Sequence, residues 1–279
     1  MDLPVTAASQ IFLLALISPA IFLTHLLARS YGFFKCEGGA QLEISLPRLL
    51  SVFTVYLLGL TLLGNLIFSL ALLTFTPTPS QSAILTTLTY LPIASAIIFL
   101  SLKPNLWNRD KKQTSDLVRS FFRGIATWPL AFPSSLFIHA LLTLLLFLLT
   151  TFTPKSQRML DDFQRIFNEN RWGIPSISLL FLILIMGPLV EEILFRGFLQ
   201  NYLKKFLKVK WAILITSLLF AALHFDRSSG LNNIPLIASL LVFSLYLGYL
   251  YQREGTLFAS FGLHMTFNLI SMLQIIYGM

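Results

Sequence analysis

Long apolar runs alternate with short polar segments along the whole chain. The runs cover residues 9–28, 50–75, 82–102, 127–152, 174–199, 210–226, 233–251 and 256–277. Each has close to the 20 or so residues that a helix needs to cross the hydrocarbon core of a bilayer. The pattern predicts an all-α, polytopic membrane protein with about eight transmembrane helices. Apolar residues at helical spacing in the polar connection before residue 174 also predict an interfacial helix, over residues 158–169, that rests on the lipid headgroups.

Composition and charge support this fold class and exclude an ordinary soluble domain. Hydrophobic residues make up 56% of the chain and charged residues only 11%, against roughly 25% charged in an average soluble protein. Counted on alternate sides of the spans, the 20 Lys and Arg divide into 15 and 5. The positive-inside rule places the richer side in the cytoplasm and both termini outside. Membrane orientation therefore explains the net charge of +8, and we expect the lipid bilayer, not nucleic acid, as a partner.

Polar residues inside the spans are the candidates for chemistry, because an ionisable group in hydrocarbon usually faces a cavity or a partner. Glu191 and Glu192 are adjacent in the fifth span, and Arg196 follows one turn later. Residues at i and i+4 share a helix face, whereas neighbours are turned by about 100°. Glu192 and Arg196 can therefore pair, while Glu191 points elsewhere and suits a general base. Pro188 lacks an N–H and predicts a kink just before the pair.

Three further polar residues lie in later spans. His264 and Asn268 are four residues apart in the eighth span, so both can offer hydrogen-bond donors to one developing oxyanion. His224 lies near the end of the sixth span and could share a water with Glu191. The chain has no His-Glu-x-x-His helix, so we expect no metal or cofactor, although three separate helices could still assemble a zinc site.

These residues form three ordered motifs that are similar to those of a known family. The motifs are Glu-Glu-x-x-x-Arg, Phe-x-x-x-His and His-x-x-x-Asn, matched by Glu191, Glu192 and Arg196, by Phe220 and His224, and by His264 and Asn268. In this order the chain resembles the CAAX protease and bacteriocin-processing family (CPBP or ABI family) of intramembrane endopeptidases, which includes the Ras-converting prenyl endopeptidase. The resemblance covers residue 175 to the C-terminus.

The resemblance implies a metal-independent glutamate endopeptidase with an active-site cavity inside the membrane. Glu191 and His224 would activate a water, and His264 and Asn268 would hold the tetrahedral oxyanion. Glu192, paired with Arg196, would orient the site. The implied partner is a membrane-associated protein or peptide substrate, and the implied location is a bacterial cytoplasmic (inner) membrane. We expect N-terminal helices one to four over residues 1–153 and a protease-like core over residues 154–279. The sequence contains no feature that indicates an oligomeric state.

Other functions fit part of the same pattern. A family-like protein could act without proteolysis, as an immunity factor or scaffold, and its phenotype would then survive replacement of Glu191 and His264. Intramembrane Glu and His could also form the relay of a proton-coupled transporter, but the chain shows no internal repeat of the kind many transporters carry. A zinc protease would contain stoichiometric metal and lose activity with a chelator.

Overall fold

The structure, a computed structural model, describes residues 5–30, 32–34, 42–103, 106–150, 152, 158–169 and 171–277. These ranges are mainly helical and contain no strand, only an isolated bridge between Asn108 and Thr256. The predicted all-α class is confirmed. The predicted boundary between residues 153 and 154 lies outside the described residues.

Most of the described residues lie in regular helices. They are α1 (Val5–Ser30), α4 (Pro79–Leu102), α5 (Thr114–Ala126), α6 (Trp128–Leu149), α7 (Arg158–Glu169), α11 (Val209–Ala222), α12 (Asn233–Glu254) and α13 (Leu257–Tyr277). Two further segments are continuous but irregular. The first joins α2 (Leu46–Leu58) and α3 (Gly64–Leu72) through the π-helix η1 (Gly59–Leu63). The second joins α8 (Ile174–Phe181), α9 (Gly187–Glu192) and α10 (Asn201–Leu203) through the π-helices η2 (Leu182–Met186) and η3 (Ile193–Gln200).

All eight predicted spans correspond to helical segments, and the chain is an integral, polytopic membrane protein. Six segments of the described residues are long and apolar enough to cross a bilayer. The other two predicted spans correspond to α11 and α13. α11 has 14 residues, about 21 Å at 1.5 Å per residue, which is shorter than the roughly 30 Å hydrocarbon core. The predicted sixth span, 210–226, is therefore too long, because the helix ends at Ala222.

The early end of α11 has a local cause. The Asn233 side chain binds both main-chain groups of Asp226: the Asp226 N–H donates to Asn233 Oδ1, and Asn233 Nδ2 donates to the Asp226 carbonyl. The Asp226 side chain also caps the 3-10 helix η4 (Arg227–Asn232) by accepting from the Ser228 N–H. These polar contacts compete with continuation of the helix. The chain consequently turns at Leu223 and His224.

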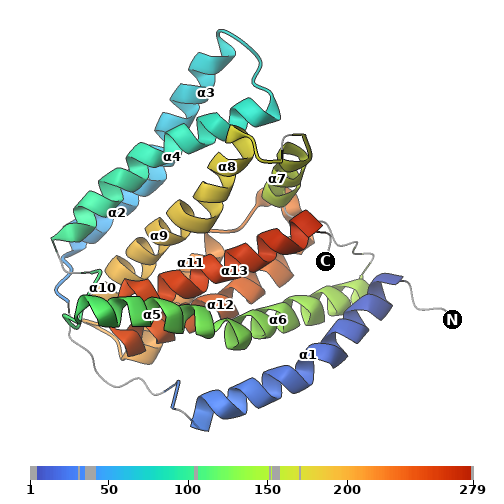
Figure 1. Ribbon diagram of the computed structural model, residues 1–279, viewed down its shortest axis with the longest axis vertical. Helices are drawn as coiled ribbons and strands as arrows, with labels where there is room; N and C mark the ends of the chain where they lie inside the picture. The colour runs from blue at the N-terminus through green and yellow to red at the C-terminus, as the bar shows by residue number, and fades with distance from the viewer. Residues whose placement is uncertain are drawn as a thin grey trace.

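The helices are arranged in three groups (Figure 1). α2, α3 and α4 lie at one side, and α1 with α6 at the other, while α12 and α13 lie between them. The segment α8–α9 runs between α4 and α13. The first turn of α1 and the last turn of α13 lie at the same end as α7, as an even number of membrane crossings requires.

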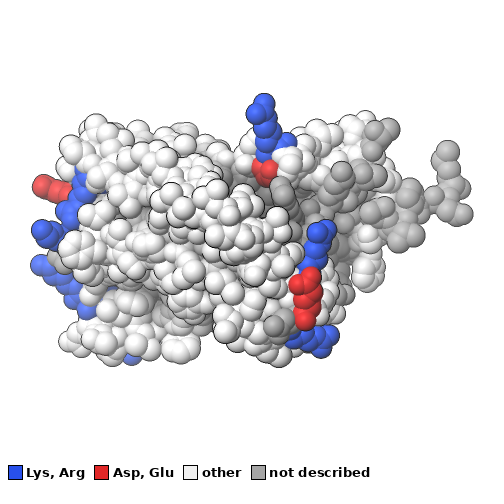
Figure 2. All heavy atoms as spheres, turned by 90° about the horizontal axis from the view of Figure 1, so that it is seen from above, with Lys and Arg blue, Asp and Glu red and all other residues white. Residues whose placement is uncertain are grey.

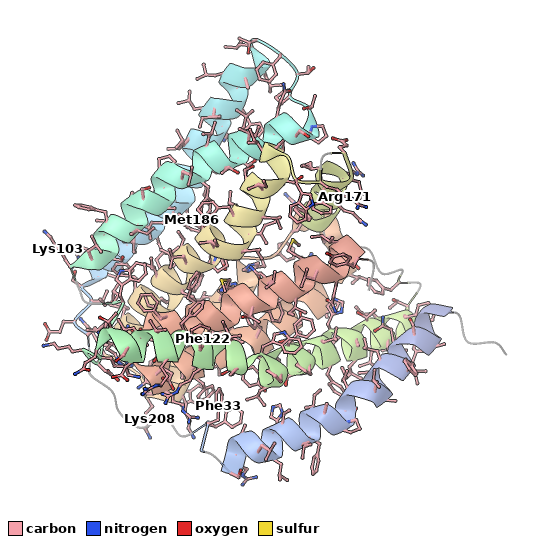
Figure 3. The ribbon with its side chains drawn as sticks, in the orientation of Figure 1. Phe33, Lys103, Phe122, Arg171, Met186 and Lys208 are labelled. Atoms are coloured by element: carbon pink, nitrogen blue, oxygen red, sulfur yellow. The ribbon has the colours of Figure 1, made fainter. Side chains whose placement is uncertain are left out.

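Charged side chains gather at two ends of the molecule. The face seen in Figure 2 shows two bands of charge separated by an uncharged belt. Lys103 and Lys208 lie at one end and Arg171 at the other (Figure 3). The sequence pattern assigned the two lysines to the side with 15 basic residues and Arg171 to the side with five. An uncharged belt between two charged ends is the surface that a bilayer requires.

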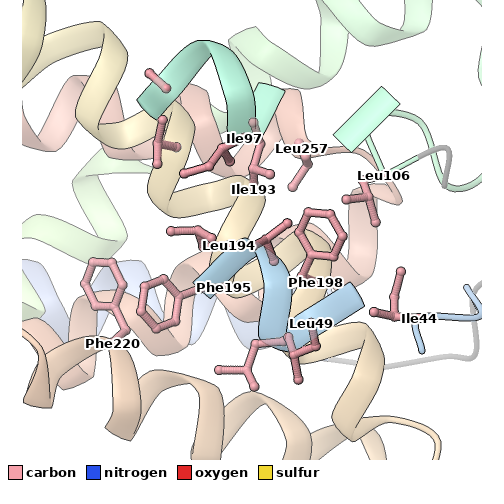
Figure 4. Packing of buried hydrophobic residues seen from close by; sticks show 14 of the residues in the cluster. Ile44, Leu49, Ile97, Leu106, Ile193, Leu194, Phe195, Phe198, Phe220 and Leu257 are labelled. Atoms are coloured by element: carbon pink, nitrogen blue, oxygen red, sulfur yellow. The ribbon is translucent and has the colours of Figure 1, made fainter. Parts of the chain in front are cut away.

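The largest buried cluster surrounds η3, and all eight η3 residues are buried. Figure 4 shows side chains of this helix packed against residues from α2, α4 and α11, among them Ile193, Leu194, Phe195, Phe198, Leu49, Ile97 and Phe220. The helix that carries both glutamates is therefore held by the N-terminal and C-terminal halves of the protein together.

α5 and α13 approach each other until their backbones touch. A Cβ atom at Gly124 of α5 would lie 2.0 Å from the Ala259 carbonyl oxygen, and one at Gly262 of α13 would lie 2.5 Å from the Phe121 carbonyl oxygen. Small residues permit this close packing of membrane helices. Because α13 also carries His264 and Asn268, the contact with α5 sets the position of part of the candidate site.

We predict that Gly124→Ala lowers the free energy of unfolding by at least about 2 kcal/mol, since the methyl group would force α5 away from α13. The midpoint of thermal unfolding in detergent measures the change. Gly64→Ala is the matched control, because a Cβ there would lie 3.7 Å from Thr89 Cγ2, an ordinary contact. Equal midpoints for the two variants would contradict the backbone contact.

Candidate active site

Glu191 and Glu192 lie at the end of α9, a short α-helical stretch between two π-helices. A π-helix contains an extra residue per turn and rotates the following side chains relative to a regular helix, and π-helical turns are frequent at functional sites. Glu192 is fully buried, while the Glu191 side chain keeps 20% of its exposure. The adjacent carboxylates therefore have different surroundings, as the helical geometry predicts.

Glu192 is the centre of a buried polar network. Its Oε1 accepts from His264 Nδ1 at 2.9 Å and lies 3.2 Å from Arg196 Nη1. The Arg196 guanidinium is also fully buried, and its Nη2 donates to Ser244 Oγ at 2.7 Å. The predicted pair of Glu192 with Arg196 is confirmed. The network joins α9, η3, α12 and α13, and it turns the His264 ring.

Glu191 faces a different partner. Its Oε2 lies 3.7 Å from His264 Nε2, so the His264 ring lies between the two carboxylates and is hydrogen-bonded to only one of them. No cationic residue within one helical turn of Glu191 pairs with it among the described residues, and the neighbouring helix α13 supplies the histidine. This leaves Glu191 with an oxygen that can accept from another group.

Phe220 organises the side chains around His224. The His224 Nδ1 lies 2.9 Å from the Phe220 carbonyl, and since a carbonyl only accepts, Nδ1 carries the proton and Nε2 is the other ring nitrogen. The Phe220 ring contacts His224, His264 and the Arg196 guanidinium, with the Arg196 Cζ 4.7 Å from the ring centroid. His224 is thus fixed by the carbonyl at the end of α11, in the turn and not within a helix.

Asn268 has a local partner that explains its position. In η2 the Gly187 N–H donates to the Leu182 carbonyl, five residues earlier. The next donor in this register would be Pro188, which has no N–H to offer the Ile183 carbonyl. Asn268 Nδ2 donates to that carbonyl at 2.8 Å. The proline thus creates the acceptor that anchors Asn268, and the second N–H of the amide remains for another partner.

The four residues predicted to be catalytic line one cavity of about 350 Å³. Glu191, His224, His264 and Asn268 come to it from α9, the turn after α11, and α13. The remaining walls are mostly apolar and include Leu182, Ile183, Leu236, Leu240, Phe243, Phe267 and Met272. The structure therefore joins the three sequence motifs at a single site, with a carboxylate, two imidazoles and an amide in an apolar enclosure.

α7 differs in one respect from the interfacial helix that the sequence predicts. α7 forms over residues 158–169 as expected, but the apolar side chains described on it face the protein and not the lipid headgroups. Phe163 and Phe167 are 1% and 5% exposed, and they pack against Ile183 and Met272. Both of these partners also line the cavity. α7 therefore covers the protein near the cavity, because its apolar face finds a closer apolar partner in α8 and α13.

Two cavity residues come from helices that carry none of the three sequence motifs. Tyr56 of α2 and Tyr90 of α4 line the same cavity as Glu191. The only sequence signal is a tyrosine in the middle of an apolar span, which also fits an ordinary packing residue. Ser244, the partner of Arg196, carried no distinguishing signal either.

The comparison with known families agrees with the motifs. Residues 173–270 match the sequence model of the family described as "Type II CAAX prenyl endopeptidase Rce1-like". This region runs from the residue before α8 into α13 and contains all three motifs, so the resemblance is confirmed, and the matched family is one of peptidases. No curated protein and no solved structure matches the chain.

We predict a strong coupling between Glu192 and Arg196. Glu192→Gln or Arg196→Met alone leaves a buried charge without its partner, which is expected to lower the free energy of unfolding by about 3–5 kcal/mol. The double variant removes both charges and should be more stable than Arg196→Met. The unfolding midpoints of the unmodified protein, the two single variants and the double variant complete a double-mutant cycle. Additive losses would show that the two charges do not stabilise each other.

A second prediction concerns the Ile183 carbonyl. Asn268→Ala should lower the free energy of unfolding by about 1–3 kcal/mol, because it leaves this buried acceptor unpaired. In the Pro188→Ala background the loss should be smaller, since residue 188 then has an N–H for the same carbonyl. Thermal unfolding of the four combinations tests this. The same loss in both backgrounds would contradict the proposed role of Pro188.

Proposed function

We propose that this chain is an intramembrane, metal-independent glutamate endopeptidase that hydrolyses a peptide bond in a membrane-associated protein or peptide. The observation that carries the proposal is the convergence of Glu191, His224, His264 and Asn268 on one cavity of about 350 Å³. The match of residues 173–270 to a prenyl endopeptidase family supports the reaction type.

Glu191 is the proposed general base. It is the carboxylate of the pair that keeps exposure toward the cavity, whereas Glu192 is sealed in its contacts with Arg196 and His264. A water between Glu191 and His224 Nε2 would give its proton to Glu191. The resulting hydroxide attacks the carbonyl carbon of the scissile peptide bond.

His264 and Asn268 are the proposed donors to the oxyanion. His264 Nδ1 already donates to Glu192, so a second donation from Nε2 requires a ring that carries both protons. Asn268 contributes its second amide N–H, because the first donates to the Ile183 carbonyl. Donors fixed in an apolar enclosure stabilise a developing negative charge strongly.

Collapse of the tetrahedral intermediate completes the reaction. The carbon–nitrogen bond breaks, the proton held by Glu191 passes to the leaving amine, and the acyl product leaves as a carboxylic acid. Glu192 and Arg196 take no proton in this scheme. They hold the His264 ring in place through Oε1 of Glu192.

A zinc mechanism is the alternative that the donor types suggest. Within the described residues, no group of three or more His, Cys, Asp or Glu is placed to hold a metal ion. The proposed scheme assigns Glu191 and His224 to water activation without a metal, and a chelator distinguishes the two mechanisms.

The apolar cavity walls and the membrane-spanning helices support a substrate that reaches the site from the bilayer. We propose a bacterial inner membrane as the location, with the end that carries Lys103 and Lys208 in the cytoplasm and both termini outside. The excess of 15 over 5 basic residues on that side supports this orientation.

The decisive experiment is cleavage of a quenched fluorescent peptide library, with a farnesylated member, by detergent-purified protein. Glu191→Gln should abolish cleavage, by at least about 10³-fold, and leave the unfolding midpoint nearly unchanged, because Glu191 is partly exposed and its 3.7 Å contact with His264 is too long for a hydrogen bond. Glu169→Gln, at an exposed carboxylate on α7, is the control and should cleave normally.

A chelator should leave the rate of cleavage by the unmodified protein and by Glu169→Gln unchanged. Cleavage that survives Glu191→Gln would remove Glu191 as the base, and inhibition by chelator would favour the zinc protease.

A further inference from the structure

We propose that the lipid-facing side of η1 and α3 is the contact surface of a homodimer, in which Asn65 of one copy pairs with Asn65 of the second copy inside the membrane. This surface lies at the edge of the molecule, where α3 packs mainly against α4 (Figure 1). The inference goes beyond the proposed function and does not rest on it.

The first observation is an amide that faces lipid. Asn65 belongs to the segment Leu46–Leu72, which is long and apolar enough to cross a bilayer. The midpoint of this segment is Gly59, and Asn65 follows about 9 Å further along the axis at 1.5 Å per residue. The hydrocarbon core extends about 15 Å to either side of its centre. The exposed Asn65 side chain therefore lies within the hydrocarbon core.

The second observation is that this amide has no partner. Among the described residues, none forms a hydrogen bond with the Asn65 side chain. The hydroxyl of Thr61, one turn earlier, differs in this respect, because it donates to the Leu57 carbonyl of its own helix. Lipid tails neither donate nor accept, so an unpaired amide at this depth loses the hydrogen bonds that it makes in water. A partner for Asn65 must come from another molecule in the membrane.

The third observation is a groove beside the amide. The groove has a volume of about 500 Å³ and is lined by Leu57, Leu60, Thr61, Gly64, Asn65 and Phe68. All six residues belong to the continuous segment α2–η1–α3, and no other described element contributes to the lining. Membrane helices associate through close packing and through hydrogen bonds between their polar side chains. A groove on one helical segment, with an unpaired amide in it, suits a second membrane helix.

The chemistry of an amide favours a second copy of this chain as that partner. Two copies inserted in the same orientation are related by a twofold axis along the membrane normal, which places both Asn65 side chains at the same depth. An amide both donates and accepts, so Nδ2 of each copy can bind Oδ1 of the other. A helix of another protein would need a matching polar group at this depth, whereas the second copy always has one.

Charge does not oppose this contact. Arg48 is the only charged residue in the segment Leu46–Leu72, and its Nη2 donates to the Leu100 carbonyl of α4. None of the residues that line the groove is charged. Two copies of a protein with a net charge of +8 can therefore meet at this face without direct contacts between like charges.

The test measures association in dioleoylphosphatidylcholine vesicles, with copies labelled at the N-terminus by a donor or an acceptor dye. Energy transfer between them should fall as the protein is diluted in lipid. Asn65→Leu should need about a tenfold higher ratio of protein to lipid for the same transfer, because two hydrogen bonds between the copies are lost.

Ser18→Leu is the matched control. Ser18 is an exposed polar residue on α1, at the other side of the molecule, and its hydroxyl donates to the Leu14 carbonyl of its own helix. This variant should associate like the unmodified protein.

Oxidative cross-linking locates the contact in variants that keep Asn65. In a Cys36→Ser background, which removes the single native cysteine, Thr61→Cys should form a disulfide between copies because Thr61 lines the groove. Leu66→Cys is the control. Leu66 is also exposed, but it lines a different groove, to which Pro92 and Ile93 of α4 contribute, and it should cross-link much more slowly. This experiment tests the contact even where Asn65→Leu does not fold.

Three results would overturn the inference. Energy transfer that is absent at every ratio of protein to lipid would show a monomer and would leave the groove to a helix of another membrane protein. Equal association of the unmodified protein and Asn65→Leu would exclude the pair of amides. Equal rates of cross-linking for Thr61→Cys and Leu66→Cys would place the contact elsewhere.

Discussion

The buried ion pair of Glu192 with Arg196 is the contact on which the arrangement of the site depends. Both side chains are fully buried in a membrane-spanning segment, where an unpaired charge is expensive. Each charge therefore requires the other, and each also binds a further side chain: His264 for the carboxylate and Ser244 for the guanidinium. Four helical segments are thereby held in one relative position. The Phe220 ring, which packs against Arg196, His224 and His264, extends the same constraint to the second histidine.

Departures from regular helix geometry also position the side chains of the candidate site. Inside a regular helix each carbonyl already accepts from a backbone N–H. Here the π register of η2 and the missing N–H of Pro188 leave the Ile183 carbonyl for Asn268. The end of α11 likewise leaves the Phe220 carbonyl for His224. Two of the four candidate catalytic side chains are therefore oriented by acceptors that exist only because a helix is interrupted.

The sequence predicts more of the scaffold than of the cavity. Spans are predictable because a bilayer demands long apolar runs, and the pairing of Glu192 with Arg196 follows from i, i+4 geometry. The face that a span turns inward is not predictable in this way, since lipid and protein interior are both apolar and Tyr90 or Ser244 differs little from its neighbours. α7 shows the same difficulty, because an amphipathic pattern predicts an apolar partner without distinguishing lipid from α8 and α13. Likewise, the end of α11 depends on the contacts between Asp226 and Asn233, which lie on either side of η4. The helical pattern of the span does not indicate these contacts.

The division of the cavity between two parts of the chain has a consequence for specificity. The proposed reacting groups, Glu191, His224, His264 and Asn268, all come from the region that matches the peptidase family, whereas Tyr56 and Tyr90 come from α2 and α4 outside it. Chemistry depends on donors held to a fraction of an ångström, which the Glu192 network and the Ile183 carbonyl provide. Substrate choice depends on groups that meet the peptide away from the scissile bond. Under the proposed function, α2 and α4 can therefore vary to suit a substrate while η3, packed between the two halves, keeps the proposed reacting groups in place.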